Sequence, residues 1–131
     1  MHVEIRRAIH EDMDWITGEL REFSKYFDSK HSLFGDEAYV RQAFMNLIDN
    51  QIVFIACNEK ERMGFIAGMF APHMFNPNIT VLYELFWWVA EKHRRSRAGL
   101  MLLKAFTNLG KKNAHWVIMT LEERTPVSDR S

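Results

Sequence analysis

The feature that most constrains the fold is a nearly all-apolar run, residues 80–89, which leads through a basic segment into a helical pattern. The run is apolar on both of its alternating faces, which is typical of a strand buried inside a sheet. Five of the six residues from Lys92 to Arg97 are basic. Apolar residues then recur at helical spacing over residues 99–109. The pattern predicts a central strand, a tight turn and a helix packed on the sheet.

Hydrophobic periodicity predicts further strands and helices around this unit, all within a single domain spanning residues 1–131. The strands are 3–8, 52–57, 64–70 and 116–121, and the helices are 11–27 and a segment that begins after an N-cap at Asp36. Residues 71–78 hold two prolines and two asparagines, so we expect a loop there. The order β-α-α-β-β-β-α-β predicts an α/β (α+β) fold with a mixed sheet.

Charge and composition exclude several classes of protein. Lys+Arg 17 balances Asp+Glu 17, so the basic segment is a local feature, and the balance argues against a nucleic-acid binder. No apolar run approaches the ~20 residues of a membrane span, and the N-terminus lacks a signal-peptide core. The single cysteine, Cys57, fits a reducing compartment. We therefore expect a cytoplasmic protein without membrane contact, and the scattered histidines predict no metal.

The basic segment lies where the central strand gives way to a helix. A helix start presents unpaired backbone N–H groups and the positive end of the helix dipole, and this combination binds phosphate. Gly99 would let a ligand approach the backbone closely, and Ala98 keeps the turn sterically open. The alternative is a solvated basic loop. The position at a strand–helix junction favours a pyrophosphate site.

The sequence HRRSRAGLMLL, which begins at His93, resembles the acetyl-coenzyme A signature of the GNAT superfamily of N-acetyltransferases, whose core is Arg/Gln-x-x-Gly-x-Gly/Ala. Arg94 matches the first position and Gly99 the last, whereas Arg97 replaces the middle glycine. The resemblance is to small phage and bacterial members. It extends from residues 5–8 through the strands at 52–57 and 64–70, which we expect to form a hairpin, to the strand at Trp116. It implies a mixed, mostly antiparallel sheet flanked by helices.

The resemblance also implies acetyl-CoA as co-substrate, with its pyrophosphate held by the basic loop. The corresponding residues are Arg94, Arg95, Ser96, Arg97, Ala98, Gly99 and Leu100. The end of the central strand, here Trp88, Val89 and Ala90, corresponds to the segment that pairs with the pantetheine arm. By the same resemblance, the N–H of Val89 would polarise the thioester carbonyl.

Transfer of an acetyl group to a primary amine requires a base, because the amine must lose a proton. Glu84 is the candidate, since it is a carboxylate within an otherwise apolar strand, and burial or a partner would perturb its pKa. The alternative is a Glu paired with a nearby Arg or Lys that closes a polar gap in the sheet. The sequence allows both interpretations.

The C-terminus departs from the family pattern, which continues with a further helix, often bearing a general-acid Tyr, and two strands. Here residues 122–131 are polar and too few for those elements. We therefore expect the strand at 116–121 to be an exposed edge, covered by the tail or by a second chain in a homodimer. The same departure leaves a second interpretation open, a catalytically weak or inactive binding protein on this fold. By the resemblance, the aromatic-rich residues 25–34 would border the pocket for the amine acceptor; the alternative is a segment that caps the core.

Overall fold

The computed structural model of the chain describes residues 2–26 and 35–120. The elements in chain order are β1 (Glu4–Arg7), η1 (His10–Asp12), α1 (Met13–Ser24), α2 (Glu37–Asn50), β2 (Ile52–Cys57), β3 (Arg62–His73), β4 (Asn76–Val89), η3 (Glu91–His93), α3 (Ala98–Asn113) and β5 (Trp116–Ile118). The strands form one sheet in the order β1-β2-β3-β4-β5. Neighbouring strands are antiparallel except β4 and β5, which pair in parallel. The expected mixed, mostly antiparallel sheet flanked by helices is confirmed.

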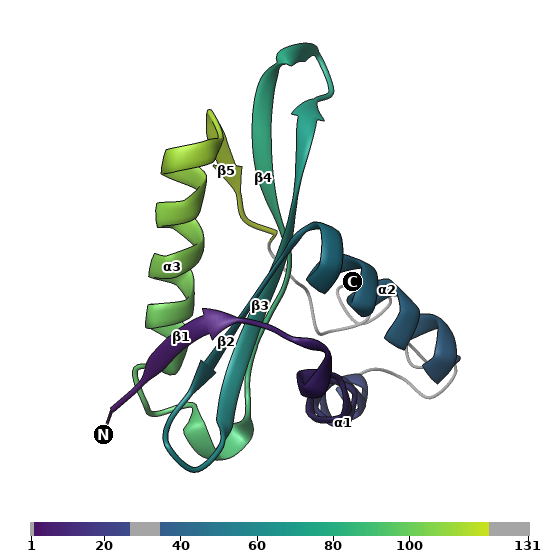
Figure 1. The fold of residues 1–131 in the computed structure, drawn as a ribbon, viewed down its shortest axis with the longest axis vertical. Helices are drawn as coiled ribbons and strands as arrows, with labels where there is room; N and C mark the ends of the chain where they lie inside the picture. The colour runs from purple at the N-terminus through teal and green to yellow at the C-terminus, as the bar shows by residue number, and fades with distance from the viewer. Residues whose placement is uncertain (1, 27–34, 121–131) are drawn as a thin grey trace, which may run out of the picture.

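Helices cover both faces of the sheet, α3 on one and α1 with α2 on the other (Figure 1). Each face has its own hydrophobic core, because alternate residues of β2 and β3 point to opposite sides. The core under α1 and α2 includes Ile16, Leu20, Phe23, Val53, Ile55 and Phe65. The core under α3 includes Ile52, Ile66, Leu82, Leu102 and Phe106. Within the described residues, no helix is long and apolar enough to cross a bilayer.

The sequence places most elements correctly, and Asp36 caps α2 by accepting a hydrogen bond from the Tyr39 N–H. The loop expected at residues 71–78 is wrong. β3 and β4 continue through this region as a long hairpin that projects from the body, with a turn at residues 74 and 75 (Figure 1). Pro72 is tolerated in β3 because β2 ends opposite Gly68, so no strand on that side requires the missing N–H. Residues 27–34 and 121–131, with the expected acceptor loop and tail, lie outside the described residues.

A buried carboxylate joins the N-terminal segment to the sheet. Asp12 is fully buried and receives two hydrogen bonds from the Arg6 guanidinium, each 2.8 Å long. Arg62 Nε donates to the same carboxylate at 2.7 Å, and the Ile9 N–H donates at 2.8 Å. Burial alone would raise the pKa of Asp12, but these hydrogen bonds outweigh it and lower the pKa to about 2. The cluster thereby fixes the start of α1 against β1 and β3.

The Asp12→Asn variant tests this linkage. Because the folded-state pKa lies below the ordinary value, ionisation of Asp12 stabilises the fold above about pH 4, and this is lost as the pH falls toward 2. We expect Asp12→Asn to lower the free energy of unfolding by about 2–3 kcal/mol at neutral pH, with the difference shrinking in acid. Asp14→Asn is the matched control, because the Asp14 side chain is 92% exposed. Urea denaturation across the pH range measures both, and equal stability of the two variants at neutral pH would contradict the assignment.

Candidate functional site

The edge of β4 that faces β5 becomes open part-way along the strand. β5 pairs with β4 only from Val81 to Tyr83, where Tyr83 lies opposite Ile118. Beyond that point, no strand of residues 2–26 or 35–120 covers this edge of β4. The C-terminal part of β4 therefore presents backbone N–H and C=O groups with which an extended ligand can pair.

A register shift at Leu85 accompanies this opening. Gly68 pairs with Glu84 and the next residue of β3, Ala67, pairs with Phe86, so Leu85 is an extra residue in β4. Such a bulge bends a strand and redirects the residues that follow it. The same position thus marks both the end of pairing with β5 and a change in the direction of β4.

Val89 directs its backbone toward the open edge. The neighbouring Ala90 N–H donates to Met63 O of β3 at 2.8 Å. Because alternate residues of a strand bond to the same neighbour, the N–H and C=O of Val89 face away from β3. Of the three strand-end residues that the sequence singles out, Val89 thus has its main-chain groups at the open edge. Trp88, by contrast, is buried on the face covered by α1.

The turn between β4 and α3 leaves backbone donors exposed at the helix start. Ser96 Oγ donates to His93 O at 2.6 Å and accepts a hydrogen bond from the Ala98 N–H at 3.2 Å. The N–H groups of Gly99 and Leu100, which follow in the first turn, have no acceptor within the described parts of the chain. A Cβ at Gly99 would make only ordinary contacts, the nearest at 3.4 Å to Val89, so packing does not require a glycine there. The helix start is therefore a suitable anion site.

The three arginines of the loop differ in their contacts. Arg95 and Arg97 are exposed, and neither is paired with any residue in the ranges that the structure describes. Arg94 instead folds back, with Nε donating to Val89 O at 3.0 Å and Nη1 to the Tyr26 hydroxyl at 3.0 Å. Its guanidinium also lies over the Trp88 ring, 4.6 Å from the centroid. Arg95 and Arg97 are thus the loop arginines available to an anion without rearrangement.

Glu84 lies where β5 separates from β4. Its side chain is buried, with 5% of the residue exposed. Oε1 accepts a hydrogen bond from the Thr120 N–H at 2.9 Å, and the Glu84 carbonyl oxygen accepts one from Thr120 Oγ1 at 2.7 Å. The carboxylate therefore holds the segment that follows β5 at the point where the ladder has ended.

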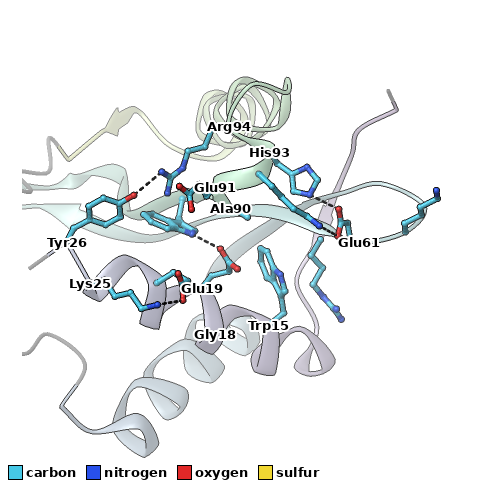
Figure 2. Close-up of a pocket in the computed structure, with 15 residues that line it drawn as sticks. Trp15, Gly18, Glu19, Lys25, Tyr26, Glu61, Ala90, Glu91, His93 and Arg94 are labelled. Atoms are coloured by element: carbon cyan, nitrogen blue, oxygen red, sulfur yellow. Dashed lines mark hydrogen bonds and ion pairs between the residues drawn. The ribbon is translucent and has the colours of Figure 1, made fainter.

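A cleft of about 960 Å³ lies on the other face of the sheet, between α1 and the end of β4. Trp15, Gly18, Glu19 and Tyr26 of the N-terminal region face it, opposite Arg94 and the η3 segment (Figure 2). At its far end, a hydrogen bond from Lys92 lowers the pKa of Glu61, and His93 Nε2 lies 2.9 Å from the same carboxylate.

The α1 side of this cleft was not predicted from the sequence. A signal for it exists, because Trp15, Gly18, Glu19 and Glu22 recur at helical spacing on the side of α1 opposite its apolar stripe.

No family model and no curated protein matches the sequence. Solved structures match over most of their length. A possible acetyltransferase from Clostridium difficile 630 aligns with a TM-score of 0.76 and 16% identity, over 99% of this chain and 86% of that chain. A predicted acetyltransferase with acetyl-CoA from Clostridium acetobutylicum aligns with a TM-score of 0.73 and 15% identity, over 93% of this chain and 82% of that chain. A transcriptional regulator from Bacillus halodurans C-125 aligns with a TM-score of 0.75 and 20% identity, over 98% of this chain and 88% of that chain.

The chain has the GNAT fold. The fold expected from the loop between Arg94 and Gly99 is thereby confirmed. At identities of at most 20% among these structures, the likeness concerns architecture, and the chemistry has to be argued from the residues of this chain.

Proposed function

We propose that the chain is an acetyl-CoA-dependent N-acetyltransferase that moves an acetyl group to a primary amine of a protein or small molecule. The observation that carries the proposal is the set of open backbone donors at the start of α3, next to the unpaired edge of β4. The N–H groups of Gly99 and Leu100 and the side chains of Arg95 and Arg97 are suited to a pyrophosphate. The acetyltransferases among the solved structures of this fold support the proposal.

The open edge of β4 suits the remainder of the co-substrate. The pantetheine arm is an extended chain with amide groups, so it can pair with a strand edge as a further strand would. On this arrangement, the Val89 N–H lies at the edge where a thioester carbonyl would be polarised. The residues assigned to this part of the site are Trp88, Val89 and Ala90, of which Val89 contributes the outward-facing main-chain groups.

The proposed reaction is direct acyl transfer. The amine nitrogen attacks the thioester carbonyl carbon, a C–N bond forms, the C–S bond breaks, and coenzyme A leaves as the thiol after taking up a proton. The amine must lose a proton, and we assign Glu84 as the base, acting directly or through water. Its position at the separation of β4 and β5 supports the assignment, because the open edge begins there.

A second candidate function is a binding protein on the GNAT fold with weak or no catalysis. Two contacts favour it. The Glu84 carboxylate already accepts a hydrogen bond from the Thr120 N–H, and Arg94 already occupies Val89 O. Acetyl-CoA binding without acetyl transfer to any amine would identify this second function.

Calorimetric titration with acetyl-CoA tests the proposed co-substrate. We expect micromolar binding by the wild type, and an affinity lowered about ten- to a hundredfold in the Arg95→Ala/Arg97→Ala double variant, because two charge-assisted hydrogen bonds are lost. The matched control is Lys111→Ala/Lys112→Ala, which removes the same charge from the opposite end of α3. Equal weakening by both double variants would indicate a general charge effect. No binding of acetyl-CoA at millimolar concentration would contradict the proposal.

We also propose that the exposed edge strand β5 is covered in a homodimer. Trp116 and Ile118 of β5 are 48% and 37% exposed, and Met119, which follows, is 36% exposed. An apolar edge strand left in solvent promotes association. We expect size-exclusion chromatography with light scattering to give twice the 15.5 kDa chain mass at micromolar concentration, and Ile118→Lys to shift the equilibrium toward monomer. A clean wild-type monomer would refute the dimer.

A further inference from the structure

Helix α1 has two faces with different roles. One face, with Met13, Ile16, Leu20 and Phe23, is buried in the core. The other carries Trp15, Gly18, Glu19 and Glu22 at steps of three and four residues, and all of them line the cleft of about 960 Å³. Figure 2 shows Trp15 and Glu19 on this helix facing the η3 segment across the cavity. The second face is therefore a continuous wall of the cleft.

Gly18 lies in the middle of α1, where a glycine is unfavourable for the helix. Neither of the usual reasons for a glycine applies. Its φ is not positive, and a Cβ built at this position would meet no atom within 4 Å. The effect of the missing side chain is to leave open space on the cleft wall beside Glu19.

Glu19 is a half-buried carboxylate without a cationic partner. Oε1 accepts a hydrogen bond from Trp88 Nε1 at 2.9 Å, and in the described ranges no Lys, Arg or His forms an ion pair with it. By contrast, Glu22 is paired with Lys25, and Glu61 with Lys92. Trp15 lies one helical turn before Glu19 and lines the same cleft, and its indole N–H has no hydrogen-bond partner among residues 2–26 and 35–120. The cleft wall thus offers one unneutralised acceptor and one unused donor.

The aromatic residues around Glu19 also suit a cation. Trp15, Tyr26 and Trp88 line the cleft, and the Arg94 guanidinium over Trp88 shows that this cluster accommodates positive charge. An ammonium group beside Glu19 would gain a charge-assisted hydrogen bond in a partly desolvated site. A neutral ligand would leave the carboxylate without a counter-ion.

We propose that the cleft binds a primary ammonium group, with Glu19 as its counter-ion, Gly18 providing the space, and the Trp15 N–H donating to an oxygen a few bonds from the nitrogen. This chemistry occurs at the amino end of an amino-acid amide or peptide and in an amino sugar. The statement that the bound amine is the acetyl acceptor rests on the proposed function. The proposal that the cleft binds an ammonium group does not depend on that function.

Calorimetry at neutral pH, without acetyl-CoA, tests the site with two ligands. Alanine amide represents an amino-acid or peptide amine, and glucosamine represents an amino sugar. The controls are lactamide, in which a hydroxyl replaces the ammonium group, and propylamine, which lacks the oxygen. We expect at least one of the two amines to bind with a dissociation constant of roughly 0.1–5 mM, as fits ligands of this size, and lactamide to bind at least tenfold more weakly. Preference for alanine amide assigns an amino-acid or peptide source, and preference for glucosamine assigns a sugar.

Two variants separate recognition from stability. Glu19→Gln keeps an acceptor for the Trp88 N–H but removes the charge, so we expect unchanged thermal stability and about tenfold weaker amine binding. Gly18→Ala improves helix propensity and meets no protein atom, so we expect an equal or higher melting temperature together with weaker binding. Asp14→Asn, on the exposed side of α1, is expected to change neither the melting temperature nor the affinity for the amines.

Amine binding that is equal in wild type, Glu19→Gln and Gly18→Ala would overturn the proposal, as would lactamide binding as tightly as the amines or no binding of either amine. A protein that binds the amines but not acetyl-CoA would retain the ammonium site and lose the proposed transferase function. The two failures are therefore distinguishable.

Discussion

The candidate site at the end of β4 depends on one constraint, which is that β5 pairs with only part of β4. The parallel ladder ends where Tyr83 lies opposite Ile118, and Glu84 then binds Thr120 through its side chain and its carbonyl oxygen. The extra residue at Leu85 falls at the same place. Because backbone N–H and C=O groups require hydrogen-bond partners, a strand edge that loses its neighbouring strand is available to an extended ligand. The end of this edge lies beside the backbone donors at the start of α3, since a Cβ at Gly99 would lie 3.4 Å from the Val89 side chain.

The two helices that flank this edge, α3 on one face of the sheet and α1 on the other, are held in place by separate contacts. Packing of α3 on its core positions the helix start beside Val89, since a Cβ at Gly99 would already contact that side chain. On the opposite face, the Asp12 cluster fixes the beginning of α1, and the bond between Trp88 and Glu19 links α1 to β4. The proposed anion site and the cleft thereby lie next to successive residues of one strand, Val89 and Trp88, on opposite sides of the sheet. This proximity is what a transfer between two substrates requires.

Much of this architecture could be predicted from the sequence, because its signals are local. The apolar run that became β4, the cap at Asp36 and the glycine at the start of α3 are each read from neighbouring residues. The hairpin around Pro72 was misread as a loop because its tolerance of proline depends on where β2 ends. The folding back of Arg94 onto Val89 O and Tyr26 depends on contacts between distant segments. The residues of α1 that line the cleft recur at helical spacing in the sequence. Whether they form a binding site depends on the segments that face them, which are distant in the sequence.

We propose that the start of α3 and the end of β4 form one binding site for coenzyme A. Titration of ¹⁵N-labelled protein with coenzyme A, followed by amide NMR, is the decisive test. We expect the amides of Gly99 and Leu100, at the helix start, and of Val89, at the open edge, to shift together and to saturate at the same ligand concentration. Shifts confined to the α1 cleft, with these three amides unmoved at saturation, would contradict it.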